Sequence, residues 1–124
     1  MSEPSLGSVL LGSSNVEAMK SWYRTCFPDA TENEMGAFQF GAVQLFIEAH
    51  SEISGPTKEP ARSILNLDVA DCRAIEGHLK QHGAHWVRPV EQTPFGLIGT
   101  VSDPDGNLVQ LIQWGASPEA HKDA

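Results

Sequence analysis

The chain is 124 residues long, which is the size of one domain and is enough to bury a hydrophobic core without disulfides or metal ions. Its formal net charge of −8 argues against nucleic acids and anionic membrane surfaces as partners, because both attract lysine and arginine, and a small or uncharged ligand fits better. The N-terminus is polar and no stretch approaches the roughly 20 apolar residues of a membrane span, so we expect a soluble cytoplasmic protein.

Hydrophobic periodicity in the first half of the chain predicts four elements in order: a buried strand over residues 8–11, a helix over 15–23, and two strands over 37–40 and 42–48. Asn15 is a typical helix N-cap. The apolar residues of this helix fall on one face: Val16, Met19, Trp22 and Tyr23. Gly41 joins the two strands tightly, and residues 49–61, which are rich in glycine and proline, are predicted to be a linker.

The second half repeats this order: a strand over 63–69, a helix from Asp71 to Gly83, a strand beginning at 85–87, another within 94–102, and a last strand over 108–114. Matching apolar positions of the two halves keep a constant offset, which carries position 9 to 65 and position 23 to 79. We therefore predict a single domain, residues 1–124, built from two tandem modules at about 6–48 and 62–114, with a polar tail at 115–124.

A turn signature precedes the last strand. Pro94-Phe95-Gly96 is followed by Asp103-Pro104-Asp105-Gly106-Asn107 and then by the alternating segment 108–112. Pro104 supplies the fixed φ of the first turn position, the aspartates bond back to their own backbone, and Gly106 takes the positive φ that closes the hairpin. This segment predicts a tight β-hairpin leading into the final strand.

The element order, the internal repeat and this turn signature resemble the glyoxalase/bleomycin-resistance/dioxygenase group, also called the vicinal oxygen chelate superfamily, over about residues 6–114. The resemblance implies an α+β fold in which two tandem βαβββ modules form curled mixed sheets around a concave cavity, usually in a homodimer. Members include isomerases, dioxygenases, thiol transferases and metal-free drug binders, so the fold does not settle the activity.

Strand alternation predicts which side chains face the cavity, because successive side chains point to opposite faces. In the strand over 63–69, the odd-numbered residues are uniformly apolar and are assigned to the helix-facing core. The same argument applied to four strands assigns these residues to the concave side: Ser8, Leu10, Gly12, Gln44, Phe46, Glu48, Ile64, Asn66, Asp68, Leu108, Gln110 and Ile112. The cavity wall is therefore expected to be mostly apolar with a few amides.

Metal-dependent members of the family carry one ligand on the first and one on the fourth strand of each module, typically His, Glu or Gln. The resemblance places these positions at Ser8, Gln44, Ile64 and Gln110. Isoleucine cannot coordinate a metal, serine is a poor ligand at neutral pH, and two neutral amides do little to balance a divalent charge. We therefore expect no metal at the family position and no cofactor, with a divalent metal kept as an alternative.

Three other groups of residues are candidates for a chemical role. His78, His82 and His85 include an HxxxH pair that could bind zinc, although an ordinary outer helix explains it as well. Glu48 and His50 end the fourth strand and could form an acid–base pair or a solvated rim pair. Cys26 and Cys72 are too far apart in sequence for a CxxC motif; Cys72 begins a helix, where the macrodipole could lower its pKa, or it simply packs in the core.

Two functional hypotheses follow. The first is a metal-free protein that sequesters a drug or metabolite in a cavity lined by Leu10, Gln44, Phe46, Glu48, Ile64, Asn66 and Gln110. The second is an enzyme of the superfamily, of isomerase, lyase or dioxygenase type, with displaced ligands such as Glu48 and His50. A structural or regulatory role is a third possibility. The sequence leaves open whether residues 49–61 close within one chain or cross to a partner.

Overall fold

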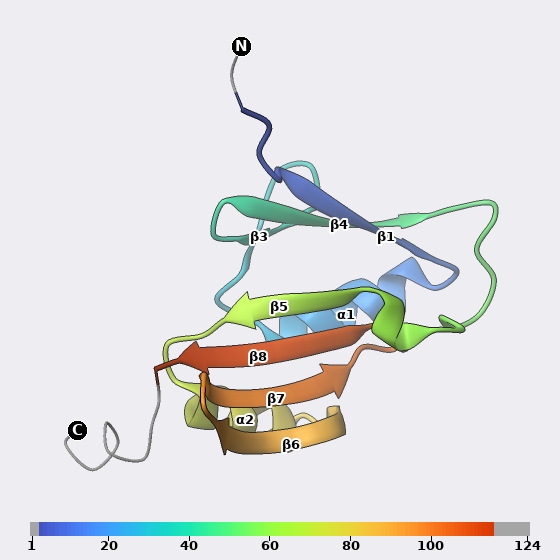
Figure 1. The fold of residues 1–124 in the computed structure, drawn as a ribbon. Helices are drawn as coiled ribbons and strands as arrows, with labels where there is room; N and C mark the ends of the chain where they lie inside the picture. Colours follow the sequence, from blue (N-terminus) through green and yellow to red (C-terminus); the bar gives the residue numbers. More distant parts are fainter. Residues whose placement is uncertain (1–2, 116–124) are drawn as a thin grey trace. The chain divides into compact units, whose positions relative to one another are not determined.

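In the computed structural model, which describes residues 3–115, the strand–helix–strand–strand–strand order occurs twice (Figure 1). The chain divides into two units, unit 1 up to Gly55 and unit 2 from Pro56. Each unit contains one four-stranded mixed sheet and one α-helix. The α+β fold of two tandem βαβββ modules predicted from the sequence is therefore confirmed.

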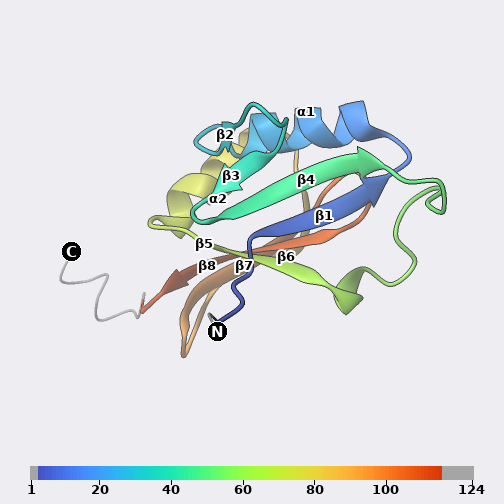
Figure 2. The ribbon, with the colours of Figure 1, turned by 90° about the horizontal axis from the view of Figure 1, so that it is seen from above.

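Unit 1 consists of β1 (Ser8–Ser13), α1 (Val16–Cys26), β2 (Thr31–Glu32), β3 (Phe38–Phe40) and β4 (Val43–Ala49). The strand order is β1-β4-β3-β2, in which β1 and β4 are parallel and the other pairs are antiparallel. Figure 2 shows α1 lying along one face of this sheet. Because β1 and β4 are parallel, the chain has to cross over between them, and α1 is part of that crossover.

The core of unit 1 lies between α1 and the sheet. Met19 and Tyr23 are buried on the predicted apolar face of the helix. Aromatic rings connect the helix and the residue that follows it to the sheet: the rings of Tyr23 and Phe38 lie 6.2 Å apart, and the rings of Phe27 and Phe40 meet edge to face at 5.9 Å. The Asn15 side chain accepts a hydrogen bond from Ala18 N at 3.3 Å, which confirms the predicted N-cap.

Unit 2 consists of a 3-10 helix, η1 (Pro60–Arg62), and of β5 (Ile64–Asp68), α2 (Cys72–Gln81), β6 (His85–Thr93), β7 (Gly96–Ser102) and β8 (Leu108–Trp114). Figure 1 shows its strands side by side in the order β5-β8-β7-β6, with α2 on one face. The fully buried residues of this unit come from α2, β7 and β8: Cys72, Leu79, Val101, Val109 and Leu111.

The Asp103–Asn107 turn has the chemistry predicted from its sequence. One Asp103 carboxylate oxygen accepts hydrogen bonds from Asp105 N at 3.0 Å and from Asn107 N at 2.9 Å. Gly106 has a φ of 86°, and its N–H donates to the Asp103 carbonyl at 2.9 Å. The turn is therefore held by a buried carboxylate and closed by a residue that tolerates positive φ.

The structure differs from the predicted elements at several places. The strand β2, only two residues long, shows no hydrophobic period of its own and was not predicted. The strand β1 continues to Ser13, beyond the predicted residues 8–11, and α1 continues to Cys26, beyond the predicted residues 15–23. The strand β6 reaches Thr93 through two irregularities in its pairing with β7, and such irregularities interrupt strict alternation. The predicted linker 49–61 contains the start of η1.

The predicted polar tail, residues 115–124, lies outside the described residues except for Gly115. Among the helices of residues 3–115, none has the length and apolar content needed to cross a membrane.

Candidate ligand-binding faces

Each sheet has one face turned away from its helix, which we call the open face. In unit 1, β1 and β4 lie side by side in a register that pairs Ser8 with Gln44 and Leu10 with Phe46. Leu45 and Ile47, which alternate with these residues on β4, are buried against the helix side. The side chains of Gln44 and Phe46 are half-buried, while Leu10 is 52% exposed. The alternation predicted from the sequence is therefore confirmed for these strands.

Gln44 is the most constrained polar residue on the open face of unit 1. Asn33 Nδ2 donates a hydrogen bond to Gln44 Oε1 at 2.8 Å. The oxygen of Asn33 in turn accepts from the backbone N–H groups of Met35 at 3.0 Å and Ala37 at 3.1 Å. A loop after β2 therefore determines which end of the Gln44 amide is engaged.

The open face of unit 2 carries a polar row across its strands. The register places Asn66 opposite Gln110 and Gln110 opposite Thr100. Gln110 Nε2 donates to Asn66 Oδ1 at 3.1 Å, and the Thr100 hydroxyl donates to Gln110 Oε1 at 3.4 Å. On β6, Arg88 is the register partner of Thr100, and its guanidinium pairs with Glu91 at 2.8 Å. The row is thus a hydrogen-bonded chain of neutral groups with a paired charge at its edge.

Apolar and aromatic groups border this row. Ile64 is 39% exposed and lies opposite Leu108. At the other end of β5, Trp114 Nε1 donates to Asp68 Oδ1 at 2.8 Å, and the Trp114 ring is 59% exposed. Ile112 was assigned to this face but is 4% exposed, so little of it is available to a ligand.

The four positions implied by the family resemblance are paired differently in the two units. In unit 1, Ser8 and Gln44 are direct partners. In unit 2, the direct partner of Gln110 is Asn66, and Ile64 pairs with Leu108 instead. The position beside Gln110 is therefore filled by the amide of Asn66, and Ile64 lies two residues earlier on β5.

These residues do not fit a metal ion. Ile64 has no donor atom, and the oxygens of Gln44 and Gln110, which are the atoms an amide offers to a metal, already accept hydrogen bonds from Asn33 and Thr100. Among residues 3–115, no cluster of three or more His, Cys, Asp or Glu side chains is arranged to hold a metal ion. The donor chemistry of these faces is that of hydrogen bonding rather than coordination.

The structure separates the other candidate groups. Glu48 and His50 are both exposed, but His50 Nδ1 accepts from Glu52 N at 3.1 Å within its own turn, and no hydrogen bond or ion pair joins it to Glu48 in the described part of the chain. The rings of His78 and His82 lie 4.5 Å apart near the end of α2. His85 lies on β6 opposite Ser102. Of the two alternatives for Glu48 and His50, this arrangement fits the solvated rim pair better than the acid–base pair.

Both cysteines are buried thiols. Burial raises the pKa of Cys26 from 9.0 to about 11. Burial also raises the pKa of Cys72, with smaller contributions from Glu76 in the same direction and from Arg73 in the opposite direction. The alternative of a lowered pKa for Cys72 at the start of the helix is therefore wrong, because burial raises it.

Two residues that contact the predicted amides were not found from the sequence. Asn33 orients Gln44, and Thr100 is hydrogen-bonded to Gln110. Asn33 has a recognisable signal, since an asparagine three residues before a glycine is typical of a side-chain-stabilised turn. Thr100 could have been found only by extending the alternation argument to β7 and by knowing its register with β8.

Comparison with known proteins agrees with this architecture. The model of the Glyoxalase/Bleomycin resistance protein/Dioxygenase superfamily matches residues 5–111. No curated protein sequence matches the chain.

Solved structures share the fold at low sequence identity. An antibiotic binding protein, TnmS3 from Streptomyces sp. CB03234, has a TM-score of 0.70 and 20% identity, over 93% of this chain and 99% of that one. TioX from Micromonospora sp. ML1 has a TM-score of 0.68 and 16% identity, over 90% and 99%. A glyoxalase/bleomycin resistance protein/dioxygenase family enzyme from Burkholderia phytofirmans PsJN has a TM-score of 0.72 and 19% identity, over 90% and 99%.

Proposed function

Because the chain belongs to the Glyoxalase/Bleomycin resistance protein/Dioxygenase superfamily, we propose that it is a member that binds a small molecule without a metal ion and acts by sequestration. The observation that carries this proposal is the state of the amides at the family's ligand positions. Gln44 and Gln110 are neutral amides that form hydrogen bonds with Asn33 and Thr100, and Ile64 at a third of these positions has no atom that could bind a metal.

The surroundings of these amides suit an uncharged or amphipathic ligand. Leu10 and Ile64 are exposed apolar side chains on the open faces, and Phe46 is half-buried beside Leu10. Small-molecule sites are mostly apolar surfaces with a few fixed polar groups. The antibiotic binding protein TnmS3, which has a similar fold, supports small-molecule binding as a function that this scaffold can perform.

The first test measures binding of the neutral dye Nile red to the wild type and to a Phe46→Ala/Gln110→Leu double variant. We expect the double variant to lose at least about tenfold in affinity, because it removes an aromatic surface and one amide hydrogen bond. The matched control is Phe95→Ala/Gln92→Leu, which changes the same residue types at exposed positions on and next to β6. Equal affinity of all three proteins for Nile red would show that the ligand does not bind to these open faces.

The second test is elemental analysis coupled to native mass spectrometry of the purified protein. We expect no stoichiometric divalent metal and a mass that includes any retained small molecule. One bound metal per chain would contradict the metal-free part of the proposal and would favour an enzyme with displaced ligands such as Glu48 and His50. The same spectrum tests the homodimer that the family resemblance implies, since a purely monomeric mass would contradict it.

A further inference from the structure

The hydrogen bonds around Gln44 determine which end of its amide is available to a ligand. The oxygen and nitrogen ends of an amide side chain are distinguished by their partners. Asn33 Oδ1 accepts from two backbone N–H groups, those of Met35 and Ala37, and a backbone N–H can only donate. The amide of Asn33 therefore cannot turn around, and its Nδ2 is the end that meets Gln44.

The fixed orientation of the Asn33 amide determines the orientation of the Gln44 amide. Asn33 Nδ2 donates to Gln44 Oε1 at 2.8 Å, so the Gln44 amide has to place its oxygen on that side. Within residues 3–115, Gln44 Nε2 has no hydrogen-bond partner and is not among the buried polar atoms that lack one. The open face of unit 1 therefore presents an accessible NH2 group at this position.

The polar row of unit 2 also ends in an NH2 group that has no hydrogen-bond partner among the described residues. The Thr100 hydroxyl donates to Gln110 Oε1, and Gln110 Nε2 donates to Asn66 Oδ1. Donation thus runs in one direction across three strands, and the final group is Asn66 Nδ2. Asn66 is exposed, and its NH2 group has no partner in the described part of the chain. The two faces independently present hydrogen-bond donors.

The charges near these donors decide between neutral and anionic acceptors. Within residues 3–115, the eight strands carry one Lys or Arg residue, Arg88, and its guanidinium is paired with Glu91. Glu48 and Asp68 are exposed on the same open faces, and the chain has a net charge of −8. An anionic ligand would meet unfavourable charge on both faces, whereas a neutral carbonyl would not.

We propose that each open face selects neutral small molecules that present a carbonyl-type hydrogen-bond acceptor, to Gln44 Nε2 in unit 1 and to Asn66 Nδ2 in unit 2. This inference rests on the proposed binding function and specifies its ligand class. It assigns to Asn33 the role of a positioning residue, which acts by orienting the Gln44 amide.

The test uses two neutral three-ring fluorescent probes. N-methylacridone has a ring carbonyl that only accepts hydrogen bonds, and carbazole has a ring N–H that only donates. The measured quantity is the ratio of their association constants, titrated with the wild type, Gln44→Glu and Asn66→Asp. Each substitution keeps the shape and the existing acceptor but replaces the NH2 group with a carboxylate oxygen.

We expect the ratio of N-methylacridone to carbazole affinity to fall about tenfold in each variant, because a donor to the carbonyl is lost and an acceptor for carbazole is gained. Gln81→Glu, at the exposed end of α2, makes the same change away from both sheets and should leave the ratio unchanged. An unchanged or increased ratio in both face variants would overturn this inference while leaving small-molecule binding intact. Failure of both probes and of Nile red to bind the wild type would overturn the proposed function together with it.

Discussion

Two turns of the molecule have the same hydrogen-bond pattern but serve their sheets differently. In the turn at Asn33 and in the turn at Asp103, the side-chain oxygen of the first residue accepts from the backbone N–H groups two and four residues later. In both, the N–H of the fourth residue, a glycine, donates to the backbone carbonyl of the first. The difference is chemical: Asn33 keeps an NH2 group, which reaches Gln44, whereas the Asp103 carboxylate has no proton to donate.

The consequence is that Gln44 and Gln110 are oriented by different parts of their units. A loop residue orients Gln44, and side chains of the two neighbouring strands orient Gln110. The same residue type on the fourth strand of each unit is therefore sensitive to different substitutions. A change in the turn should alter the open face in unit 1 and leave the open face of unit 2 as it is.

The largest effect should come from the turn of unit 2. Asp103 is 4% exposed, and its carboxylate accepts from Asp105 N, Asn107 N and Asn107 Nδ2. Asp103→Ala leaves these donors without a partner, so we expect the free energy of unfolding to fall by about 3 kcal/mol, measured by urea denaturation. Asp103→Asn is the control, because its remaining oxygen can still accept from the backbone, and it should lose roughly 1 kcal/mol. Equal losses would show that the carboxylate charge, and not the turn, is what matters.

The second effect is the pH dependence of stability that comes from the buried thiol of each unit, Cys26 in unit 1 and Cys72 in unit 2. Because the pKa of Cys26 is raised from 9.0 to about 11 in the folded state, the unfolded chain loses its thiol proton first as the pH rises. The stabilising contribution is complete below pH 9 and is lost between pH 9 and pH 11. At pH 10.5 we expect the wild type to lose about 2 kcal/mol more than Cys26→Ala does, relative to pH 8.

Urea denaturation of both proteins at the two pH values measures this difference, and all other titrating groups cancel in it. Cys72→Ala supplies the matching comparison from unit 2, where burial raises the thiol pKa in the same direction. Parallel pH profiles for the wild type and Cys26→Ala would contradict the raised pKa of Cys26.

The third effect tests the coupling that distinguishes the two turns. Asn33→Asp keeps the acceptor for the backbone N–H groups of Met35 and Ala37 but can no longer donate to Gln44. The Gln44 amide should then turn to donate to residue 33 and expose its oxygen, at a cost in unfolding free energy of about 1 kcal/mol or less. The ratio of N-methylacridone to carbazole affinity should fall severalfold even though position 33 needs no contact with the probe.

The control for this experiment is Asp103→Asn, which makes the reverse exchange in the turn of unit 2. Since the Asp103 turn is not hydrogen-bonded to Gln110, the probe ratio should stay at the wild-type value. If the ratio fell as much for Asp103→Asn as for Asn33→Asp, the claim that only the turn at Asn33 controls an open-face amide would be contradicted.

Local chemistry explains which parts of the fold the sequence could predict. The caps at Asn15 and Asp71 and the turn at Asp103 depend on residues a few positions apart, and each is confirmed. Strand alternation likewise assigned Leu45 and Ile47 to the core and Gln44 to the open face. The short strand β2 was not located, because two residues are too few to show a period.

The contacts between the site residues depend on strand register. Register is set by residues far apart in the chain, so local sequence patterns do not predict it. Asn66 and Gln110 were both placed on the concave side, but only the pairing of β5 with β8 shows that they are direct partners. The contact between Asn33 and Gln44 requires in addition the path of the loop after β2. Residue types and faces were therefore predictable, and the direction of the hydrogen bonds was not.

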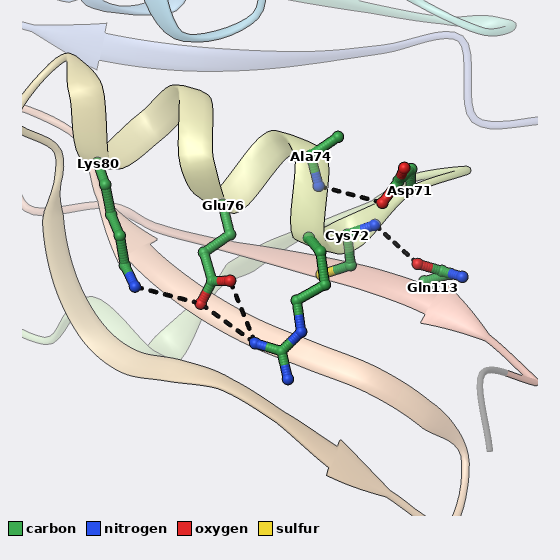
Figure 3. Close-up of polar contacts among 7 residues, drawn as sticks. Asp71, Cys72, Ala74, Glu76, Lys80 and Gln113 are labelled. Atoms are coloured by element: carbon green, nitrogen blue, oxygen red, sulfur yellow. Dashed lines mark hydrogen bonds and ion pairs between the residues drawn. The ribbon is translucent and has the colours of Figure 1, made fainter. Parts of the chain in front are cut away.

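The smallest predicted effect compares how the two units begin their helices. Asp71 accepts from Ala74 N at 3.1 Å, and Gln113 Oε1 accepts from Cys72 N at 2.7 Å, so two N–H groups of the first turn of α2 have side-chain partners (Figure 3). In α1 the corresponding cap bond, from Ala18 N to Asn15, is longer at 3.3 Å. Asp71 also carries a negative charge, which the N-terminal end of a helix stabilises.

We therefore expect Asp71→Ala to lower the unfolding free energy by about 1 kcal/mol and Asn15→Ala to lower it by about half as much. Urea midpoints at constant m-value measure both, and Asp71→Asn isolates the charge, with an expected loss of a few tenths of a kcal/mol. If Asn15→Ala were the more damaging substitution, the helix of unit 1 would depend more on its cap than that of unit 2. Gln113 Oε1 can still accept from Cys72 N when Asp71 is removed, so the loss should grow from about 1 kcal/mol in Asp71→Ala to about 2 kcal/mol in Asp71→Ala/Gln113→Leu.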